Sequence, residues 1–295
     1  MTQTINPKEF SAILAPSNES IPAESNILSD FFQETFALTK RLFIQLQRRP
    51  STLVAGVIQP FMWLILFGAL FYNAPQSLFG EQFSYGRFLA PGIIVFTAFS
   101  GALNAGLPIM FDREFGFLNR LLVAPLTTRF SIVAASTIYI ISLSLIQTAV
   151  IITASAFIGA GLPSFTGLSA IALIVFLIVL GVTGLSLGLA FALPGHIELL
   201  AVIFVINLPL LFASTALAPM NFMANWLQII ASLNPLTYAI EPIRYIYQNG
   251  DWSLGSIVIN TPWLDVNFGL VLLLLCTFDA LILLAIKPLL SRRFA

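Results

Sequence analysis

The sequence predicts an all-α membrane protein with six transmembrane helices. Of its 295 residues 58% are hydrophobic and only 9% are charged, and Phe alone occurs 27 times. A soluble domain carries about one quarter charged residues. In addition, uncharged runs of about 18 residues or more, the length that crosses a bilayer, recur along the chain.

Six such runs define the predicted spans. Five contain no charged residue, and the last contains a single Asp. The predicted spans are 51–72, 88–110, 130–158, 167–193, 199–218 and 266–286. Together they make one six-span domain over residues 50–295.

The basic residues predict the orientation of these spans. With the N-terminus inside, Arg87 and Arg244 are the only two of the 13 Lys and Arg residues that fall outside. Because cytoplasmic loops are rich in Lys and Arg, both termini are predicted to be cytoplasmic. Residues 1–26 lack an apolar core, so a disordered cytoplasmic tail is expected there and not a signal peptide. The single Cys276 forms no intramolecular disulfide.

Residues 27–49 are predicted to form an amphipathic helix in the cytoplasmic interface. At 100° per residue, one arc of roughly 80° collects five apolar side chains. They are Leu28, Phe32, Phe36, Phe43 and Leu46. Pro50 then breaks the chain before the first span. A merely polar lead-in is the alternative.

Residues 219–265 are predicted to form an outer helical hairpin before the last span. They contain three of the four Trp and three of the six Tyr, a density typical of a membrane interface. The patches "WLQIIASL" and "AIEPIRYIY" are too short to span, and Asn234-Pro235 separates them. An ordinary loop outside the membrane is the alternative.

The stretch "FDREFGFLNRLLVAPLTTR", residues 111–129, places five charged residues between two apolar runs. If residues 111–124 are helical, one face collects Phe111, Phe115, Leu118 and Leu122. Pro125 would end this helix. The periodicity leaves open whether the segment binds a soluble partner or is a basic loop that only sets topology.

Two motifs resemble the permeases of type-2 ABC exporters, the ABC-2 type transporter membrane subunits. "DREFGFLNRLLVAP", residues 112–125, resembles the signature after their second span, where an acidic residue and Gly precede "L-x-x-L-L-x-x-P". "NPLTYAIEPIRY", residues 234–245, is similar to the segment before their last span. The order of elements agrees over residues 27–293. Similar subfamilies include drug-resistance, nodulation-signal and polysaccharide exporters, with related permeases in cyanobacteria and algal plastids.

The resemblance implies a permease that exports a substrate, amphiphilic or lipid-linked, by alternating access. It would work with a cytoplasmic ABC ATPase subunit and with a second permease copy or a paralogue, in the cell inner (plasma) membrane or in a thylakoid or plastid membrane. ATP and Mg would bind to the ATPase, with no cofactor and no nucleic acid on this chain. The three lysines lie in "PKE", "TKR" and "IKP", so the chain has no P-loop and is not expected to be an enzyme.

In these permeases the helix after span two is the coupling helix, seated in a groove of the ATPase. The resemblance therefore implies five contact residues, Glu114, Gly116, Leu118, Leu121 and Leu122. Gly116 would permit close backbone approach, and Glu114 could pair with a basic residue of the partner. A membrane scaffold without transport activity would leave this segment unexplained.

Asp279 is an acid within the last span, about 18 Å along the helix from Asn267 and close to mid-membrane. An ionised group there is costly. Asp279 is therefore interpreted either as a proton relay in an ion-coupled secondary transporter or, as we favour, as a neutral or paired residue. The residue that it would face is Asn104, Gln147 or Asn207. No metal-ligand cluster or nucleophile–base arrangement is visible, and His196 is predicted to be a cytoplasmic surface residue.

Overall fold

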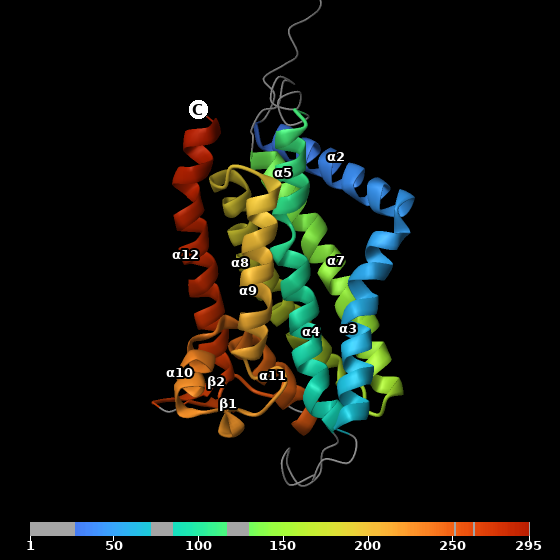
Figure 1. Cartoon of the computed structure of the whole chain (residues 1–295), viewed down its shortest axis with the longest axis vertical. Coiled ribbons are helices and arrows are strands. Elements are labelled where there is room, and N and C mark those ends of the chain that lie inside the picture. Colours follow the sequence, from blue (N-terminus) through green and yellow to red (C-terminus); the bar gives the residue numbers. More distant parts are fainter. Residues whose placement is uncertain (1–26, 72–84, 117–129, 251, 262, 295) are drawn as a thin grey trace, which may run out of the picture.

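The computed structural model describes residues 27–71, 85–116, 130–250, 252–261 and 263–294. In this part of the chain the long helices run side by side along one axis (Figure 1). The C-terminus lies at one end of the bundle, which we call the terminal end. Short helices and strands gather at the other, which we call the hairpin end. The predicted tail, residues 1–26, falls outside the described residues.

Five helical segments of the described chain are long and apolar enough to cross a membrane. They are α3 (Pro50–Leu70), α4 (Tyr85–Leu103) continued by α5 (Gly106–Glu114), α7 (Phe130–Phe157), α8 (Phe165–Ala192) and α12 (Phe268–Phe294). Only 11% of the apolar window of α3 is buried within the chain, whereas 72% of the α4–α5 window is. α3 therefore lies at the edge of the bundle and the α4–α5 segment near its centre.

The fifth predicted span, 199–218, is wrong in its extent. α9 (His196–Phe212) has 17 residues, fewer than the ~20 that a full span needs. Asn234 binds its end, since its side-chain amide donates to the carbonyls of Leu210 and Ala213 at 2.8 and 2.7 Å. These carbonyls would otherwise be left without partners at the helix C-terminus.

The hairpin end contains the two short helices that the sequence predicted. Its elements are η2 (Met220–Phe222), α10 (Asn225–Leu233), α11 (Pro235–Asn249), β1 (Ile257–Asn260) and β2 (Asp265–Asn267). Asn234 separates the helices and caps α11, since its Oδ1 accepts from the Leu236 nitrogen at 2.9 Å. The two strands pair antiparallel, so the all-α prediction missed a small sheet. Strands of four and three residues are too short to show an alternating pattern.

α2 (Ile27–Arg48) lies across the terminal end and packs on α7 (Figure 1). Thr35 and Thr39 are buried in this contact. Glu34 accepts a hydrogen bond from the Ser131 hydroxyl of α7 at 2.8 Å. The predicted apolar face is only partly in contact with the bundle. Phe43 contacts Tyr139 of α7, with the ring centroids 5.4 Å apart. The remaining apolar side chains at its start are exposed, namely Leu28, Phe32 and Phe36.

Glycines of α8 let α12 approach closely. A Cβ added at Gly184 would lie 3.1 Å from the Ile282 side chain, and one added at Gly188 would lie 2.8 Å from that of Ile286. Contacts as close as the second are essentially absent from real structures, so α12 packs onto glycine backbone here. Gly184 and Gly188 thus serve helix packing within the chain.

Candidate functional site

α5 extends the second span to the terminal end, and a turn follows it. The Gly116 nitrogen donates to the Arg113 carbonyl at 3.3 Å, and Gly116 has a φ of +73°. This left-handed conformation favours glycine and closes helix C-termini. A single helix over the whole of 111–124, the condition on which the predicted apolar face depends, is not formed, since α5 ends at Glu114 and a turn follows. Outside the described residues lie three predicted contact residues, Leu118, Leu121 and Leu122.

A break of two residues separates α4 from α5. Pro108 has no N–H to donate to the carbonyl of Asn104, four residues earlier, so the regular hydrogen-bond ladder is interrupted there. Ser186 of α8 fills the gap. Its hydroxyl donates to the Leu103 carbonyl at 2.5 Å and accepts from the Gly106 nitrogen at 2.9 Å. α5 is thus a separate segment fixed to α8 by a buried hydrogen-bond pair.

Arg113 joins the end of α5 to the end of α8. Its guanidinium donates to the carbonyls of Ala190 at 2.8 Å, Leu193 at 2.6 Å and Pro194 at 2.7 Å. The last carbonyls of a helix have no partner within the helix and carry its partial negative charge. A planar guanidinium satisfies several of them at once, which one ammonium group does less well.

Glu114 joins the same segment to the start of α9. Its Oε1 accepts from the His196 backbone nitrogen at 2.6 Å, and its Oε2 lies 2.5 Å from the His196 ring Nδ1. The N-cap residue of α9, Gly195, has no side chain to cap the helix. A carboxylate from α5 supplies the missing acceptor at the positive end of the helix dipole. The Phe111 ring also packs on His196, with ring centroids 5.2 Å apart.

The sequence singled out Glu114 and Gly116, whose predicted contact with an ATPase stays a prediction, and it did not point to the contacts of Arg113, Ser186 and His196. It assigned the Glu114 carboxylate to a partner protein, whereas in the structure both oxygens meet His196, whose side chain is 34% exposed. A helix beginning at "PGH", without Ser, Thr, Asp or Asn at its N-cap, is the one local sign that a distant acceptor is needed.

The prediction that Asp279 faces Asn104, Gln147 or Asn207 is wrong. Its side chain is buried against α8, where a Cβ added at Gly181 would lie 2.3 Å from its Oδ1. Within the described part of the chain, neither carboxylate oxygen has a hydrogen-bond partner. Asn207 instead bonds to Ser100, 3.1 Å away.

The comparisons with known proteins agree with this architecture. The model of the ABC-2 type transporter family matches residues 33–247, which reach from α2 to α11. The chain belongs to the ABC-2 type transporter family. This permease is 58% identical over 252 residues to a Porphyra purpurea protein named "Putative transport permease ycf38", covering 85% of this chain and 87% of the relative. It is 53% identical over 271 residues to the Cyanophora paradoxa protein of that name, covering 92% and 93%.

A more distant relative is named for a specific transport role. The permease is 25% identical over 271 residues to the Mycobacterium tuberculosis protein named "Probable doxorubicin resistance ABC transporter permease protein DrrC", covering 86% of this chain and 94% of that protein.

Among the residues that the structure describes, no group of three or more His, Cys, Asp and Glu could hold a metal ion. The site that α5 builds consists of hydrogen bonds to the ends of α8 and α9.

Proposed function

We propose that this chain is the membrane subunit of an ATP-driven exporter. A separate cytoplasmic ABC ATPase binds ATP and Mg, and a second permease copy or a paralogue completes the transport path. The substrate, amphiphilic or lipid-linked, moves outward by alternating access. Membership of the ABC-2 family and the similarity to a protein named as an ABC transporter permease support this assignment.

The observation that carries the proposal is the pair Arg113–Glu114. These adjacent side chains bind the ends of two different helices, α8 and α9. Hydrogen bonds to charged groups are stronger than those between neutral groups, so the helix ends should follow a displacement of α5. An ATPase that pushes on the turn after α5 would therefore move the ends of α8 and α9 together.

Exposed apolar side chains beside this turn support a docking surface for the ATPase. Phe115 is 79% exposed and Ile197, at the start of α9, is 69% exposed. Leu118, Leu121 and Leu122 follow in the sequence and extend the proposed contact. The Glu114 side chain keeps 26% of its surface exposed, which leaves room for a basic residue of the ATPase as well.

The proposed orientation places the terminal end in the cytoplasm and α2 in the membrane interface. The exposed side chains of Leu28, Phe32 and Phe36 would then meet lipid, where apolar burial is favourable. The cell inner (plasma) membrane is the proposed site. Similarity to the Porphyra and Cyanophora proteins keeps a thylakoid or plastid membrane as the alternative.

Co-purification with a candidate ABC ATPase tests this function. Burying Leu118 should contribute about 1.5–3 kcal/mol, so Leu118→Asp should abolish association at an unchanged membrane level. Glu114→Lys should weaken association less, because it removes one attraction and adds a repulsion. Asn249→Ala at the hairpin end is the matched control and should leave association unchanged.

Two outcomes decide between the candidate functions. If both variants retain wild-type association and permease-stimulated ATP turnover, the segment after α5 only sets topology and the ATP-driven assignment is wrong. The ion-coupled alternative would need a proton acceptor near Asp279, and the carboxylate packs on Gly181 instead.

A further inference from the structure

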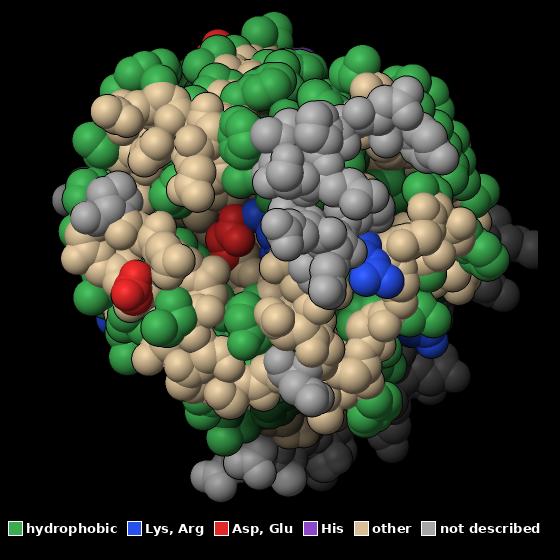
Figure 2. Space-filling model, turned by 90° about the horizontal axis from the view of Figure 1, so that it is seen from below, with side chains coloured by type: hydrophobic (Ala, Val, Ile, Leu, Met, Phe, Trp, Pro, Cys, Tyr) green, Lys and Arg blue, Asp and Glu red, His purple; other side chains and the backbone are tan. Residues whose placement is uncertain are grey.

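A cavity of about 270 Å³ opens at the hairpin end of the bundle. Figure 2 shows this end, where an acidic and a basic side chain lie together in a hollow near the middle of the face. Glu241 and Arg244 of α11 line the cavity, together with Asn221, Gln248 and Asn260. Five polar side chains from three separate segments thus converge on one small space. Its volume is below the ~300 Å³ at which pockets for drug-sized ligands begin, so it suits a single ring or headgroup.

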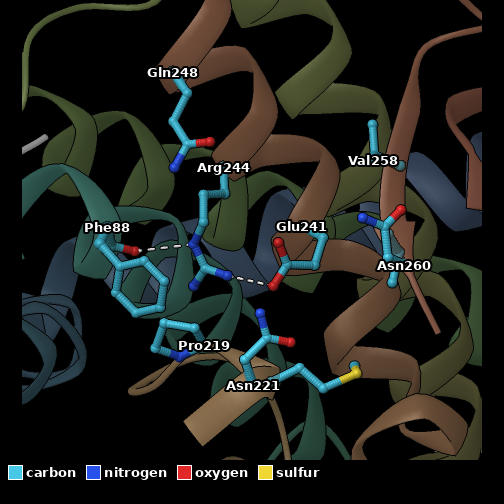
Figure 3. A pocket seen from close by; sticks show the side chains of 10 residues that line it. Phe88, Pro219, Asn221, Glu241, Arg244, Gln248, Val258 and Asn260 are labelled. Atoms are coloured by element: carbon cyan, nitrogen blue, oxygen red, sulfur yellow. Dashed lines mark hydrogen bonds and ion pairs between the residues drawn. The ribbon is translucent and has the colours of Figure 1, made fainter. Parts of the chain in front are cut away.

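The guanidinium of Arg244 forms its hydrogen bonds within the protein. It is only 4% exposed and donates from Nε to the Phe88 carbonyl at 3.3 Å and from Nη2 to the Thr215 carbonyl at 2.6 Å. Its Nη1 donates to Glu241 Oε1, and its guanidinium carbon lies 3.8 Å from the centre of the Phe88 ring (Figure 3). Burial lowers the pKa of Arg244, and the neighbouring Glu241 charge opposes this effect. The guanidinium stays charged and its charge is balanced by Glu241.

The amide side chains that line the cavity form no hydrogen bonds with other described residues. Asn221 and Asn260 point toward Glu241 from different sides, and Gln248 lies one turn along α11 from Arg244 (Figure 3). Within the described part of the chain no hydrogen bond holds any of these three amides, and Glu241 uses only Oε1 on Arg244. The cavity therefore offers amide donors and amide and carboxylate acceptors.

We propose that this cavity binds an uncharged, hydroxyl-rich group, the sugar ring of a glycolipid or a free sugar, during export. The assignment deepens the proposed function and rests on it, since it names the chemistry of the exported group. Each hydroxyl both donates and accepts, so neighbouring hydroxyls match a carboxylate oxygen beside a side-chain amide. Phe88, Val258 and Ile259 supply apolar lining for the C–H face of the ring.

The charge balance of the cavity argues against ionic ligands. A phosphate or carboxylate would meet an arginine already paired with Glu241, and an ammonium group would meet a carboxylate already neutralised by Arg244. Either ion would have to compete with an existing buried pair and lose its own hydration. A neutral polyol forms its hydrogen bonds without separating the pair.

Binding to the full-length permease in phosphatidylcholine nanodiscs tests the proposal without the ATPase. Methyl hexoside is titrated calorimetrically, and retention of a one-hexose glycolipid is measured by native mass spectrometry. Asn260→Ala and Gln248→Ala should each weaken binding about three- to tenfold, the loss of roughly one hydrogen bond. Asn249→Ala is the control, because Asn249 follows Gln248 on α11 but does not line the cavity.

The outcomes show whether the bound sugar is lipid-borne or free, and they test the sugar site separately from the ATP-driven function. The site is supported if either probe binds, if Asn260→Ala weakens that binding and if Asn249→Ala leaves it unchanged. Binding of the glycolipid alone indicates a lipid-borne sugar. Binding of the hexoside indicates a free sugar. No binding of either probe, equal binding by all variants, or tighter variant-sensitive binding of choline or phosphate overturns it. If sugar binds and the ATPase does not associate, the site stands and the ATP-driven function fails; the reverse result removes only the sugar assignment.

Discussion

The carboxylate of Glu114 caps the helix that begins at His196, 82 residues later in the chain, with both oxygens within 2.6 Å of His196 nitrogens. Glu114 is the last residue of α5, and Arg113 beside it holds the end of α8. Two consecutive residues thus connect α5 to the turn between α8 and α9. This turn is the place where the proposed ATPase movement enters the bundle.

Glu114→Gln should separate docking from transmission. The amide keeps the size of the side chain but loses the charge that favours the α9 N-terminus, so the helix end should loosen. Transport and stimulated ATP turnover should fall while the ATPase still co-purifies. His196→Ala should act more mildly, since the backbone bond to Glu114 remains. If the losses of transport in Glu114→Gln and His196→Ala simply add in the double variant, the two residues are not directly coupled.

Arg113→Lys should destabilise the permease although it preserves the charge. A single ammonium cannot reach the three carbonyls in the geometry of the guanidinium, and the buried Ala190 carbonyl would lose a partner at a cost of about 1–3 kcal/mol. The midpoint of thermal unfolding in detergent measures this change. Lys40→Arg, at an exposed position of α2, is the control for basic substitutions at the terminal end. An unchanged midpoint for Arg113→Lys would show that the carbonyl contacts contribute little.

The buried pair of α11 should respond differently to single and double substitution. Arg244→Met leaves Glu241 uncompensated and should cost about 3–5 kcal/mol of stability. Replacing both charges, in Arg244→Met with Glu241→Leu, should recover much of that loss, because no charge is then left unpaired. Thermal unfolding of the three proteins at equal detergent concentration checks the order. A double variant less stable than Arg244→Met would mean that the pair itself is strongly stabilising.

Substitutions at Asp279 and Gly181 should distinguish charge from shape. Asp279→Asn should preserve most transport, because the side chain keeps its size and packs on glycine rather than on a titratable partner. Gly181→Ala should cost about 1–3 kcal/mol, since its Cβ would overlap Asp279 and Phe278. Asp279→Ala should partly relieve that clash. Complete loss of transport in Asp279→Asn at a normal membrane level would instead favour proton coupling.

Reporter fusions should show the C-terminus on the cytoplasmic side. The prediction rests on the excess of Lys and Arg at the terminal end, and a fusion after Ala295 tests it directly. A second fusion within residues 251–255 should report the opposite side. Activity of the first fusion only outside the cell would place the turn after α5 on the wrong face for an ATPase.

The sequence by itself determined the membrane class, five of the spans, the α2 helix and the division of the hairpin at Asn234-Pro235. These features depend on the length and periodicity of apolar runs and on proline, which are local properties of the chain.

Only the tertiary structure decided where helices end and which polar groups meet. Asn234 binds the end of α9 from more than 20 residues away, Ser186 closes the break before α5 from 80 residues away, and Asp279 packs on Gly181 of another helix. Unpaired carbonyls and N–H groups at helix ends must find partners inside a bundle from which water is excluded. Which distant side chain supplies the partner depends on how the helices pack, and no local pattern of residues encodes that.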